Sequence, residues 1–349
     1  MSNSEQLDLQ RGQWVEVRSV EEITATLDEN VALDGMPFMP EMVAFCGKRF
    51  TVRSRADSTC DTVSASGMRR MEHTVHLSTL RCDGAAHGGC QAGCLLFWKE
   101  AWLRRVPAAQ SQASSNNGAA RNGVGAVGRD RAWLQARTIQ SEPADPEIRY
   151  RCQATELKKA SQPLPWWKPG QYLRDIFVNR ESSIDVIRGF VCATLNKLTR
   201  RFRGHGFPNV AGTLKQTPVQ ELGLQPGEWV IVKSREEIVA TLDKSGRNRG
   251  LVFDGEMLPF CGKRFRVLRR VEKILEESTG RMIKPRGTSV ILENVFCTSR
   301  FRRVCPRAIY SYWREIWLRR APVEENLATP SESPCLIGDV ESDHLVPGG

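Results

Sequence analysis

The chain has 349 residues, of which 40% are hydrophobic and 26% are charged, and its formal net charge is +10. This length is enough for two or three domains that each bury a core, and the composition excludes a chain that is disordered throughout. The sequence contains neither a signal-like N-terminus nor a run of about 18 apolar residues, so we expect a cytoplasmic protein with no membrane partner.

Eleven cysteines are unusual for such a chain. In a reducing compartment, an odd and clustered set does not favour a disulfide framework. It favours metal binding, redox chemistry or burial of the thiols as small side chains.

The sequence repeats itself at an offset of 215 residues. WVEVRSVEEITATLD from Trp14 matches WVIVKSREEIVATLD from Trp229 at eleven of fifteen positions, FCGKRF recurs at Phe45 and Phe260, and WLRR recurs at Trp102 and Trp317. One shared offset indicates a duplicated unit of constant length.

Each copy begins with a short strand and a short helix. The β-rich residues 14–17 predict a strand, and Ser19 with Glu22 predicts a capping box at the start of a helix. Ser234 and Glu237 repeat this signal in the second copy. The two copies should therefore share their first elements.

The later elements of each copy are two strands and a helix. FCGKRFTV from Phe45 and HTVHL from His73 have the alternation of strands. Trp98 and Trp102 are four residues apart, which predicts a helix with both indoles on one face, and Trp313 with Trp317 repeats the spacing. We expect these indoles to pack in the core and along its edge.

Several short strands in about 95 residues favour small antiparallel barrels. The predicted fold is mainly β with short helices (α+β), with two tandem barrels joined by a flexible linker and a helical middle segment. The predicted divisions are a first barrel repeat with a Cys-rich loop at 1–107, a flexible linker at 108–147, a helical middle segment at 148–222, a second barrel repeat at 223–322 and a disordered tail at 323–349.

The order of PEM, CGKRF, a further strand and Trp-Leu within residues 38–105 resembles a Src-homology-3-like barrel, and in particular the C-terminal barrel of the nitrile hydratase β subunit. The resemblance implies a barrel that supports a partner protein. It carries over no catalytic residue, because the Cys-rich insertion has no place in that family.

A cluster of cysteines in the first copy is the candidate metal site. Cys82, Cys90 and Cys94 form a C-x7-C-x3-C array, Cys60 can join them from a hairpin, and His87 can replace one thiolate. Zinc takes four thiolate or imidazole ligands, and iron-sulfur clusters take four thiolates. Nearby glycines allow the tight backbone turns that such a loop needs.

The second copy lacks most of these ligand types. Cys46, Cys82 and Cys90 correspond to Cys261, Cys297 and Cys305, whereas Cys60, His73, His76, His87 and Cys94 correspond to Leu275, Thr288, Ile291, Arg302 and Ile309. Such a difference is what the gain or loss of a metal site would produce.

Other interpretations of these residues stay open. The thiols could be unliganded and buried, or could form a redox pair, and Cys46 fits a small core residue in a strand. His73 and His76 should lie on opposite faces of a strand, with His76 as a hydrogen-bonded core residue. A second site could combine Cys297 and Cys305 with Cys152 or Cys192.

The sequence predicts a zinc- or iron-sulfur-binding accessory protein that uses its barrels and Trp-bearing helices to dock a protein partner. An iron-sulfur electron-transfer protein is one alternative, and nucleic-acid binding by the basic barrels is another. No catalytic signature is present, and a cysteine nucleophile at Cys60 has no further support, so enzymatic activity stays undecided.

Overall fold

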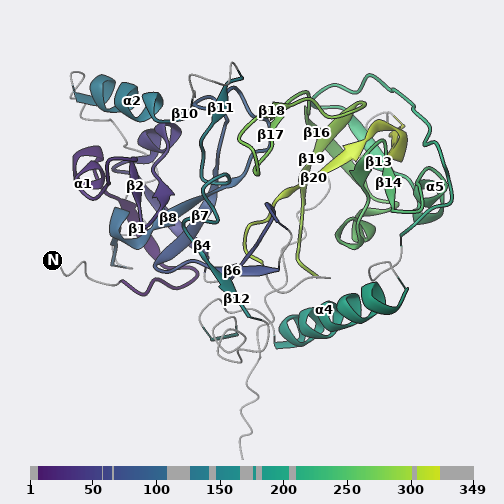
Figure 1. Cartoon of the computed structure of the whole chain (residues 1–349), viewed down its shortest axis with the longest axis horizontal. Coiled ribbons are helices and arrows are strands. Elements are labelled where there is room, and N and C mark those ends of the chain that lie inside the picture. Colours follow the sequence, from purple (N-terminus) through teal and green to yellow (C-terminus); the bar gives the residue numbers. More distant parts are fainter. Residues whose placement is uncertain are drawn as a thin grey trace, which may run out of the picture.

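The computed structural model describes residues 7–56, 58–64, 67–107, 126–140, 147–165, 176–177, 183–203, 210–300 and 305–322. Over these residues the chain is mainly β, and each half builds a partly closed antiparallel barrel (Figure 1). None of the helices in the described part combines the length and the apolar character needed to cross a bilayer.

Each half-barrel is one five-stranded antiparallel sheet. In the first half the strand order is β8 (Leu95–Lys99), β7 (Thr74–Arg81), β4 (Arg49–Arg55), β1 (Trp14–Val17) and β9 (Leu103–Arg105). In the second half it is β20 (Tyr310–Arg314), β19 (Ser289–Phe296), β16 (Arg264–Arg270), β13 (Trp229–Val232) and β21 (Leu318–Arg320). Equivalent strands begin 215 residues apart, so the predicted duplication is confirmed element by element.

The short helices begin where the sequence predicts. Helices α1 (Val20–Thr24) and α5 (Arg235–Val239) each start with a complete Ser-to-Glu capping box. Two 3-10 helices follow, η1 (Pro40–Phe45) and η4 (Gly255–Phe260), and each leads into the second strand of its sheet. Small hairpins complete the pattern, namely β2 (Ala32–Leu33) with β3 (Met36–Pro37) and β14 (Arg247–Asn248) with β15 (Leu251–Val252).

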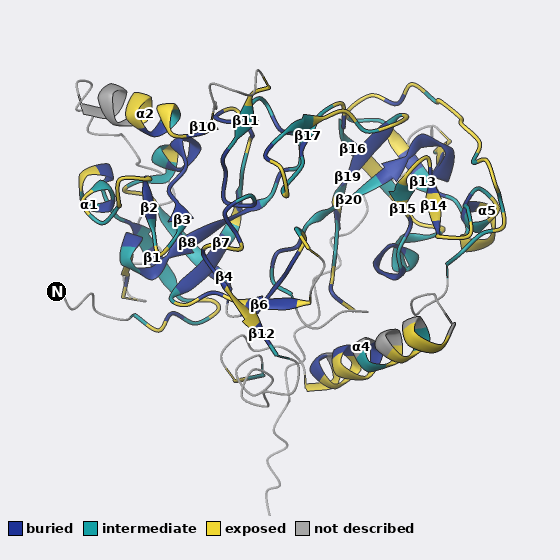
Figure 2. Ribbon diagram, viewed as in Figure 1, coloured by how far each residue is buried: buried dark blue, intermediate teal, exposed yellow. Residues whose placement is uncertain are grey.

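The prediction of tryptophan-bearing helices is wrong. Trp98 lies in strand β8 and Trp102 ends the 3-10 helix η2 (Glu100–Trp102), and η5 (Glu315–Trp317) repeats this arrangement. Both indoles are fully buried and meet the ring of Phe38 edge-on, at centroid distances of 6.4 and 5.3 Å. A strand followed by one 3-10 turn places two residues that are four positions apart in the same core. A helix does the same, so the spacing alone does not distinguish the two structures. These side chains are therefore not a docking surface, and strand β8 is coloured as buried in Figure 2.

Segments between the two halves pack onto the first half. The strands are β10 (Ile139–Gln140), β11 (Arg149–Tyr150) and β12 (Gln162–Leu164), and helix α2 (Ala126–Ala136) precedes them. Cys152 and Leu157 belong to the first core, and so does Leu134 of α2. The prediction of a flexible linker is thus not confirmed for residues 126–140, whereas 108–125 and the predicted tail at 323–349 lie outside the described residues.

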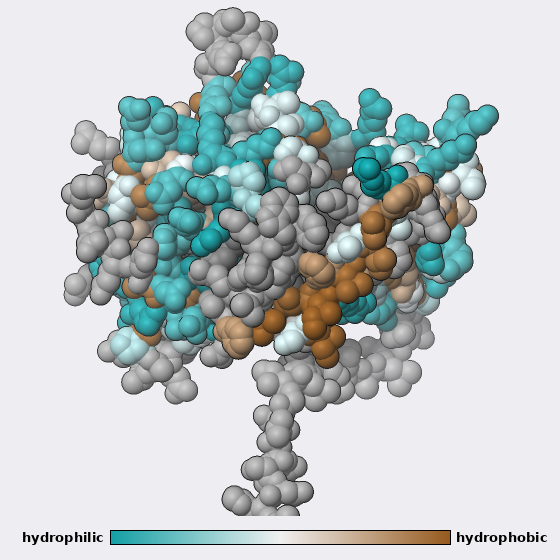
Figure 3. Space-filling view, turned by 60° about the horizontal axis from the view of Figure 1, so that its bottom comes forward, coloured by the Kyte–Doolittle hydropathy of each residue, from teal (hydrophilic) through white to brown (hydrophobic). Residues whose placement is uncertain are grey.

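A long helix, α4 (Ser183–Arg203), confirms the predicted helix of the middle segment. It lies along the lower edge of the molecule in Figure 1. Much of its apolar face is exposed, and apolar side chains gather in a band on the corresponding face of Figure 3.

Two hairpins connect the halves reciprocally. Hairpin β5 (Thr59–Cys60) with β6 (Met68–Arg70) reaches the second half, and hairpin β17 (Ile274–Leu275) with β18 (Met282–Ile283) reaches the first. The amide of Cys60 donates to Cys305 Sγ at 3.2 Å, and the equivalent amide of Leu275 donates to Cys90 Sγ at 3.2 Å. The hydroxyl of Thr62 also donates to its own equivalent, Glu277. The halves therefore meet in a nearly symmetric arrangement.

Candidate metal centre

A small cavity of about 30 Å³ lies between the Cys-rich loop, η1 and the β17–β18 hairpin. Its ligand-type lining residues are Glu41, Cys82, His87, Cys90, Cys94, Cys152 and Glu277. A volume of this size holds a water molecule or a single ion. The cavity therefore gathers an unusual density of metal-binding side chains.

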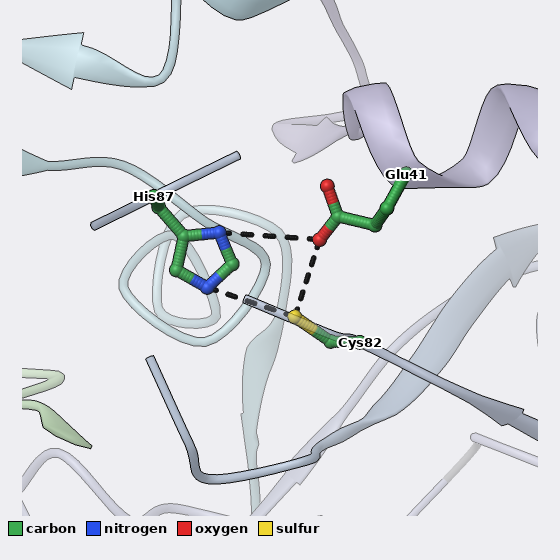
Figure 4. A group of neighbouring side chains, drawn as sticks. All are labelled: Glu41, Cys82 and His87. Atoms are coloured by element: carbon green, nitrogen blue, oxygen red, sulfur yellow. Dashed lines mark hydrogen bonds and ion pairs between the residues drawn. The ribbon is translucent and has the colours of Figure 1, made fainter. Parts of the chain in front are cut away.

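Three of these side chains lie close enough to share an ion (Figure 4). Cys82 Sγ is 3.2 Å from Glu41 Oε1 and 3.6 Å from His87 Nε2, and His87 Nδ1 is 3.9 Å from Glu41 Oε1. One ligand atom from each residue lies within 4.8 Å of the others. For a tetrahedral zinc with Zn–S bonds of about 2.3 Å and Zn–N bonds of about 2.0–2.1 Å, sulfur and nitrogen ligands lie about 3.6 Å apart. The group Glu41, Cys82 and His87 could hold a metal ion.

The Cys-rich loop is closed by local backbone contacts. The amide of Cys82 donates to the carbonyl of Cys94 at 2.8 Å, and the amides of His87 and Gly89 both donate to the carbonyl of Gly84. Gly84 has φ +75°, and a Cβ on it would lie 1.9 Å from the carbonyl oxygen of Cys90. Only glycine fits this position, so Gly84 plays the predicted role of folding the loop tightly.

Three other glycines of the loop, Gly88, Gly89 and Gly93, also take the expected positive φ angles of +71°, +73° and +62°, and they have a second role. A Cβ on Gly88 would lie 2.8 Å from the ring of Tyr150, and a Cβ on Gly93 would lie 2.7 Å from the guanidinium of Arg269. A Cβ on Gly89 would lie 2.9 Å from Lys273 Nζ. These glycines let the middle segment and the second half approach the loop closely, which the sequence alone did not indicate.

Burial disfavours the charged forms of the three grouped side chains. Desolvation raises the pKa of Glu41 and lowers the pKa of His87 to about 4. Burial, and then the neighbouring Glu41 carboxyl, raise the pKa of Cys82 well above its usual value. His87 is therefore already in the neutral form that binds metal, whereas Cys82 needs a cation beside it to release its proton.

Two polar atoms of the group have no hydrogen-bond partner. They are Glu41 Oε2 and His87 Nδ1, both buried among described residues that offer them none. Leaving a buried polar atom unsatisfied costs about 1–3 kcal/mol. A bound cation would relieve this cost for the carboxylate of Glu41. For the imidazole, the cost would be relieved if His87 Nδ1 carried a proton and donated it to a carboxylate.

The second half satisfies the equivalent carboxylate in another way. Glu256 corresponds to Glu41, and its Oε2 accepts from the amide of Arg300 at 2.9 Å and from the hydroxyl of Thr298 at 3.3 Å. The thiol of Cys297 lies 3.8 Å from Ser299 Oγ. The chain itself thus supplies the donors that the first half lacks.

The structure separates the predicted site residues into two groups. Cys82, His87, Cys90 and Cys94 line the cavity, and burial raises the pKa of Cys94 to about 12. Cys60 lies instead against Cys305 at the contact between the halves. A hairpin that reaches out of its own half takes Cys60 away from the loop, which spacing along the chain did not reveal.

The cysteines of the predicted second site lie in different parts of the structure. Cys152 lines the first cavity and not a site in the second half, because the segment after β11 packs onto the first core. Cys305 contacts Cys60, and Cys192 is buried in α4. Neither of these two is a lining residue of the cavity.

Glu41 is the ligand-type residue that the sequence analysis missed. It stands in PEM at the start of η1, and Glu256 stands in the matching GEM. Comparing the copies selects residues that differ, so a carboxylate present in both was passed over. The sequence signal that could have identified Glu41 is its position in the EM motif that both copies share shortly before FCGKRF.

Two other interpretations of single residues are settled. His76 is fully buried, its Nδ1 is 3.0 Å from the carbonyl of Leu96, and burial lowers its pKa to about 3, which confirms a core histidine. Cys46 is not in a strand, because it follows η1 directly before Gly47. Burial raises the pKa of Cys46 to about 12.

The chain matches no protein-family model, no curated protein and no solved structure.

Proposed function

We propose that the first half of the chain binds one zinc ion that has a structural role. Cys82, His87 and Glu41 supply three of the ligands, and one of the neighbouring thiols supplies the fourth. The observation that carries the proposal is the buried group of three donors within 4.8 Å, two of whose polar atoms have no other partner.

The mixed donor set favours zinc over an iron-sulfur cluster. Zinc accepts sulfur, nitrogen and oxygen ligands in one tetrahedral site. An iron-sulfur cluster takes four thiolates around several atoms, whereas this cavity of about 30 Å³ suits one ion. A buried site in which protein side chains supply all four ligands is typical of a structural metal.

The proposed role of the protein is that of a metal-stabilised interaction module. The ion would tie η1 to the Gly-rich loop, because the free energy of metal binding becomes free energy of folding. The sequence of each repeat resembles a Src-homology-3-like barrel that supports a partner protein. A protein partner is proposed on that resemblance.

Metal content tests the zinc site directly. We expect about one zinc per chain in the purified protein, and its loss in Cys82→Ser and His87→Ala. Cys60→Ser and Cys46→Ser are matched controls that should keep the metal, because these thiols lie outside the cavity. A folded protein that contains no stoichiometric metal, or controls that lose it equally, would contradict the site.

An iron-sulfur cluster is the second candidate, and one observation favours it. Cys82, Cys90, Cys94 and Cys152 all line the same cavity, which is the number of thiolates that a cluster takes. An anaerobic preparation with visible absorption that bleaches on reduction, and that each of these four cysteines is required to produce, would establish this alternative. A colourless zinc protein would exclude it.

A further inference from the structure

Helix α4 (Ser183–Arg203) presents a long apolar stripe that the described residues leave uncovered. Its exposed fractions are 75% at Ile184, 62% at Ile187, 47% at Val191, 39% at Leu195, 47% at Leu198 and 77% at Phe202. Steps of three and four residues place these side chains on one face along the helix. At 1.5 Å per residue, the stripe runs along a helix of about 30 Å.

Among the described side chains of α4, the buried ones lie on the opposite face. Val186 is 4% exposed and Cys192 is 8% exposed, whereas Phe190 between them is 38% exposed. Among its described side chains, the helix buries small ones and exposes large apolar ones. Figure 3 shows the resulting apolar band on this face of the molecule. Exposed apolar surface of this extent marks an interaction site.

The same helix is strongly basic. Its sequence contains one acidic residue, Asp185, and five basic residues, which are Arg188, Lys197, Arg200, Arg201 and Arg203. Arg188 and Arg201 are exposed. An apolar stripe on a helix of net positive charge is the pattern of helices that lie in the interface of a bilayer.

We propose that α4 binds the surface of an anionic lipid bilayer, lying parallel to it with the stripe among the acyl chains. Lipid headgroups of negative charge complement the basic residues, and the boundary of the acyl chains accepts the apolar ones. This mode needs no segment that crosses the membrane, so it replaces the expectation of no membrane partner. A second copy fits less well, because pairing two such helices would bring like charges together.

Vesicle flotation with the full-length protein tests the proposal. We expect the protein to float with vesicles of phosphatidylcholine and phosphatidylserine mixed at about 7:3, and far less with pure phosphatidylcholine. Raising the salt concentration should weaken the binding, because it screens the attraction of basic residues to the surface.

Two variants locate the binding surface. Ile187→Glu combined with Leu198→Glu puts acidic groups into the stripe and should lower the bound fraction at least about tenfold. Val219→Glu is the matched control, since Val219 is 52% exposed outside the helix, and it should bind as the wild type does. A circular-dichroism melt shows whether each variant remains folded.

Three results would overturn the proposal. They are no flotation with the anionic vesicles, equal flotation with neutral ones, and binding that the stripe variant leaves unchanged. Light scattering that shows a dimer in the wild type and a monomer in the stripe variant, without flotation, would assign the stripe to a second copy of this chain instead. Removal of zinc should not affect flotation, because no ligand of the proposed metal site lies in α4.

Discussion

At the scale of single residues, the two halves give the same carboxylate different surroundings. Glu256 accepts hydrogen bonds from Arg300 and Thr298, whereas Glu41 faces Cys82 and His87 and has one oxygen without a partner among the described residues. The half without the histidine has donors from its own chain. The difference in the proposed chemistry therefore comes from how one acidic side chain is satisfied.

Gly84 should be irreplaceable for a reason that goes beyond its backbone angle. Gly84 and Gly47 have φ values of +75° and +73°, but a Cβ would collide with Cys90 only at Gly84, since nothing lies within 4 Å at Gly47. We expect Gly47→Ala to lower the free energy of unfolding by about 1–2 kcal/mol through the left-handed conformation alone. Gly84→Ala should cost about 1–3 kcal/mol more and should release the metal.

Urea unfolding and metal analysis of the two alanine variants check this. Equal losses of stability would show that the Cys-rich loop accommodates a side chain at Gly84, and the close approach would then have no energetic weight.

His76 should make the protein less stable in mild acid. Burial lowers its pKa to about 3, and the ordinary histidine value is about 6.5. Between these values the unfolded chain binds a proton that the folded chain does not. The free energy of unfolding should therefore fall as the pH drops from about 6.5 toward 3, by up to about 1.4 kcal/mol per pH unit.

The second half supplies the test variant, because Ile291 occupies the equivalent position. His76→Ile should flatten this part of the pH dependence in urea unfolding at pH 4.5 and 6.5. The comparison is made with a chelator present, so that metal release does not contribute. A variant with the slope of the wild type would refute the role of His76.

At the scale of elements, local signals predicted most of the fold. The capping boxes at Ser19 and Ser234 fix the helix starts, and alternation fixes strands such as β7 and β19. The tryptophan spacing failed because a 3-10 turn after a strand reproduces the helical interval. Which short elements meet in space depends on tertiary packing, so the reach of the two hairpins could not be predicted from the sequence.

The 3-10 helix η2 is held by a buried carboxylate. Glu100 accepts from the guanidinium of Arg55 at 2.7 Å and from the amides of Leu9 and Asp8 at 3.0 and 3.1 Å. Glu315 holds the equivalent turn of the second half. Glu100→Ala would remove the buried carboxylate partner of Arg55 and leave it paired with the exposed carboxylate of Asp8 at 3.3 Å. This change should lower the free energy of unfolding by about 3–5 kcal/mol.

Denaturant unfolding measures this loss. Glu16→Ala is the control, because Glu16 pairs with Arg49 at a half-exposed position and should contribute less than about 1 kcal/mol. Comparable losses in the two variants would mean that the buried contact does not fix the turn.

At the scale of the whole molecule, the second half closes the candidate metal site of the first. Gln91 donates its amide to the carbonyl of Lys273, and its side chain accepts from the amide of Lys273. Leu275 donates to Cys90 and also lines the cavity. Metal binding in the loop should therefore be coupled to the docking of the two halves.

Hydrogen exchange can measure this coupling. Removing the metal with a chelator should loosen the loop and speed exchange at the amides of Lys273 and Leu275. The amide of Cys60 is the internal control, because it makes the equivalent contact to Cys305 in a part that holds no proposed ion. Exchange that rises equally at both contacts, or at neither, would argue against the coupling.

The contact between the two halves explains why the candidate site could be predicted only in part from the sequence. The sequence revealed the duplication and the loop that differs between the copies, since both are visible in residue types. It did not reveal that Cys152 would join the cavity or that Cys60 would leave it. Those two outcomes depend on contacts between segments that lie far apart in the chain.

X-ray absorption at the zinc edge of the purified protein tests the central claim most directly. The account predicts one ordered zinc with one nitrogen and one oxygen ligand at about 2.0–2.1 Å and two sulfur ligands at about 2.3 Å. His87→Ala should abolish the signal or remove its imidazole scattering. A site made of four sulfur ligands, or a protein without bound zinc, would contradict the account.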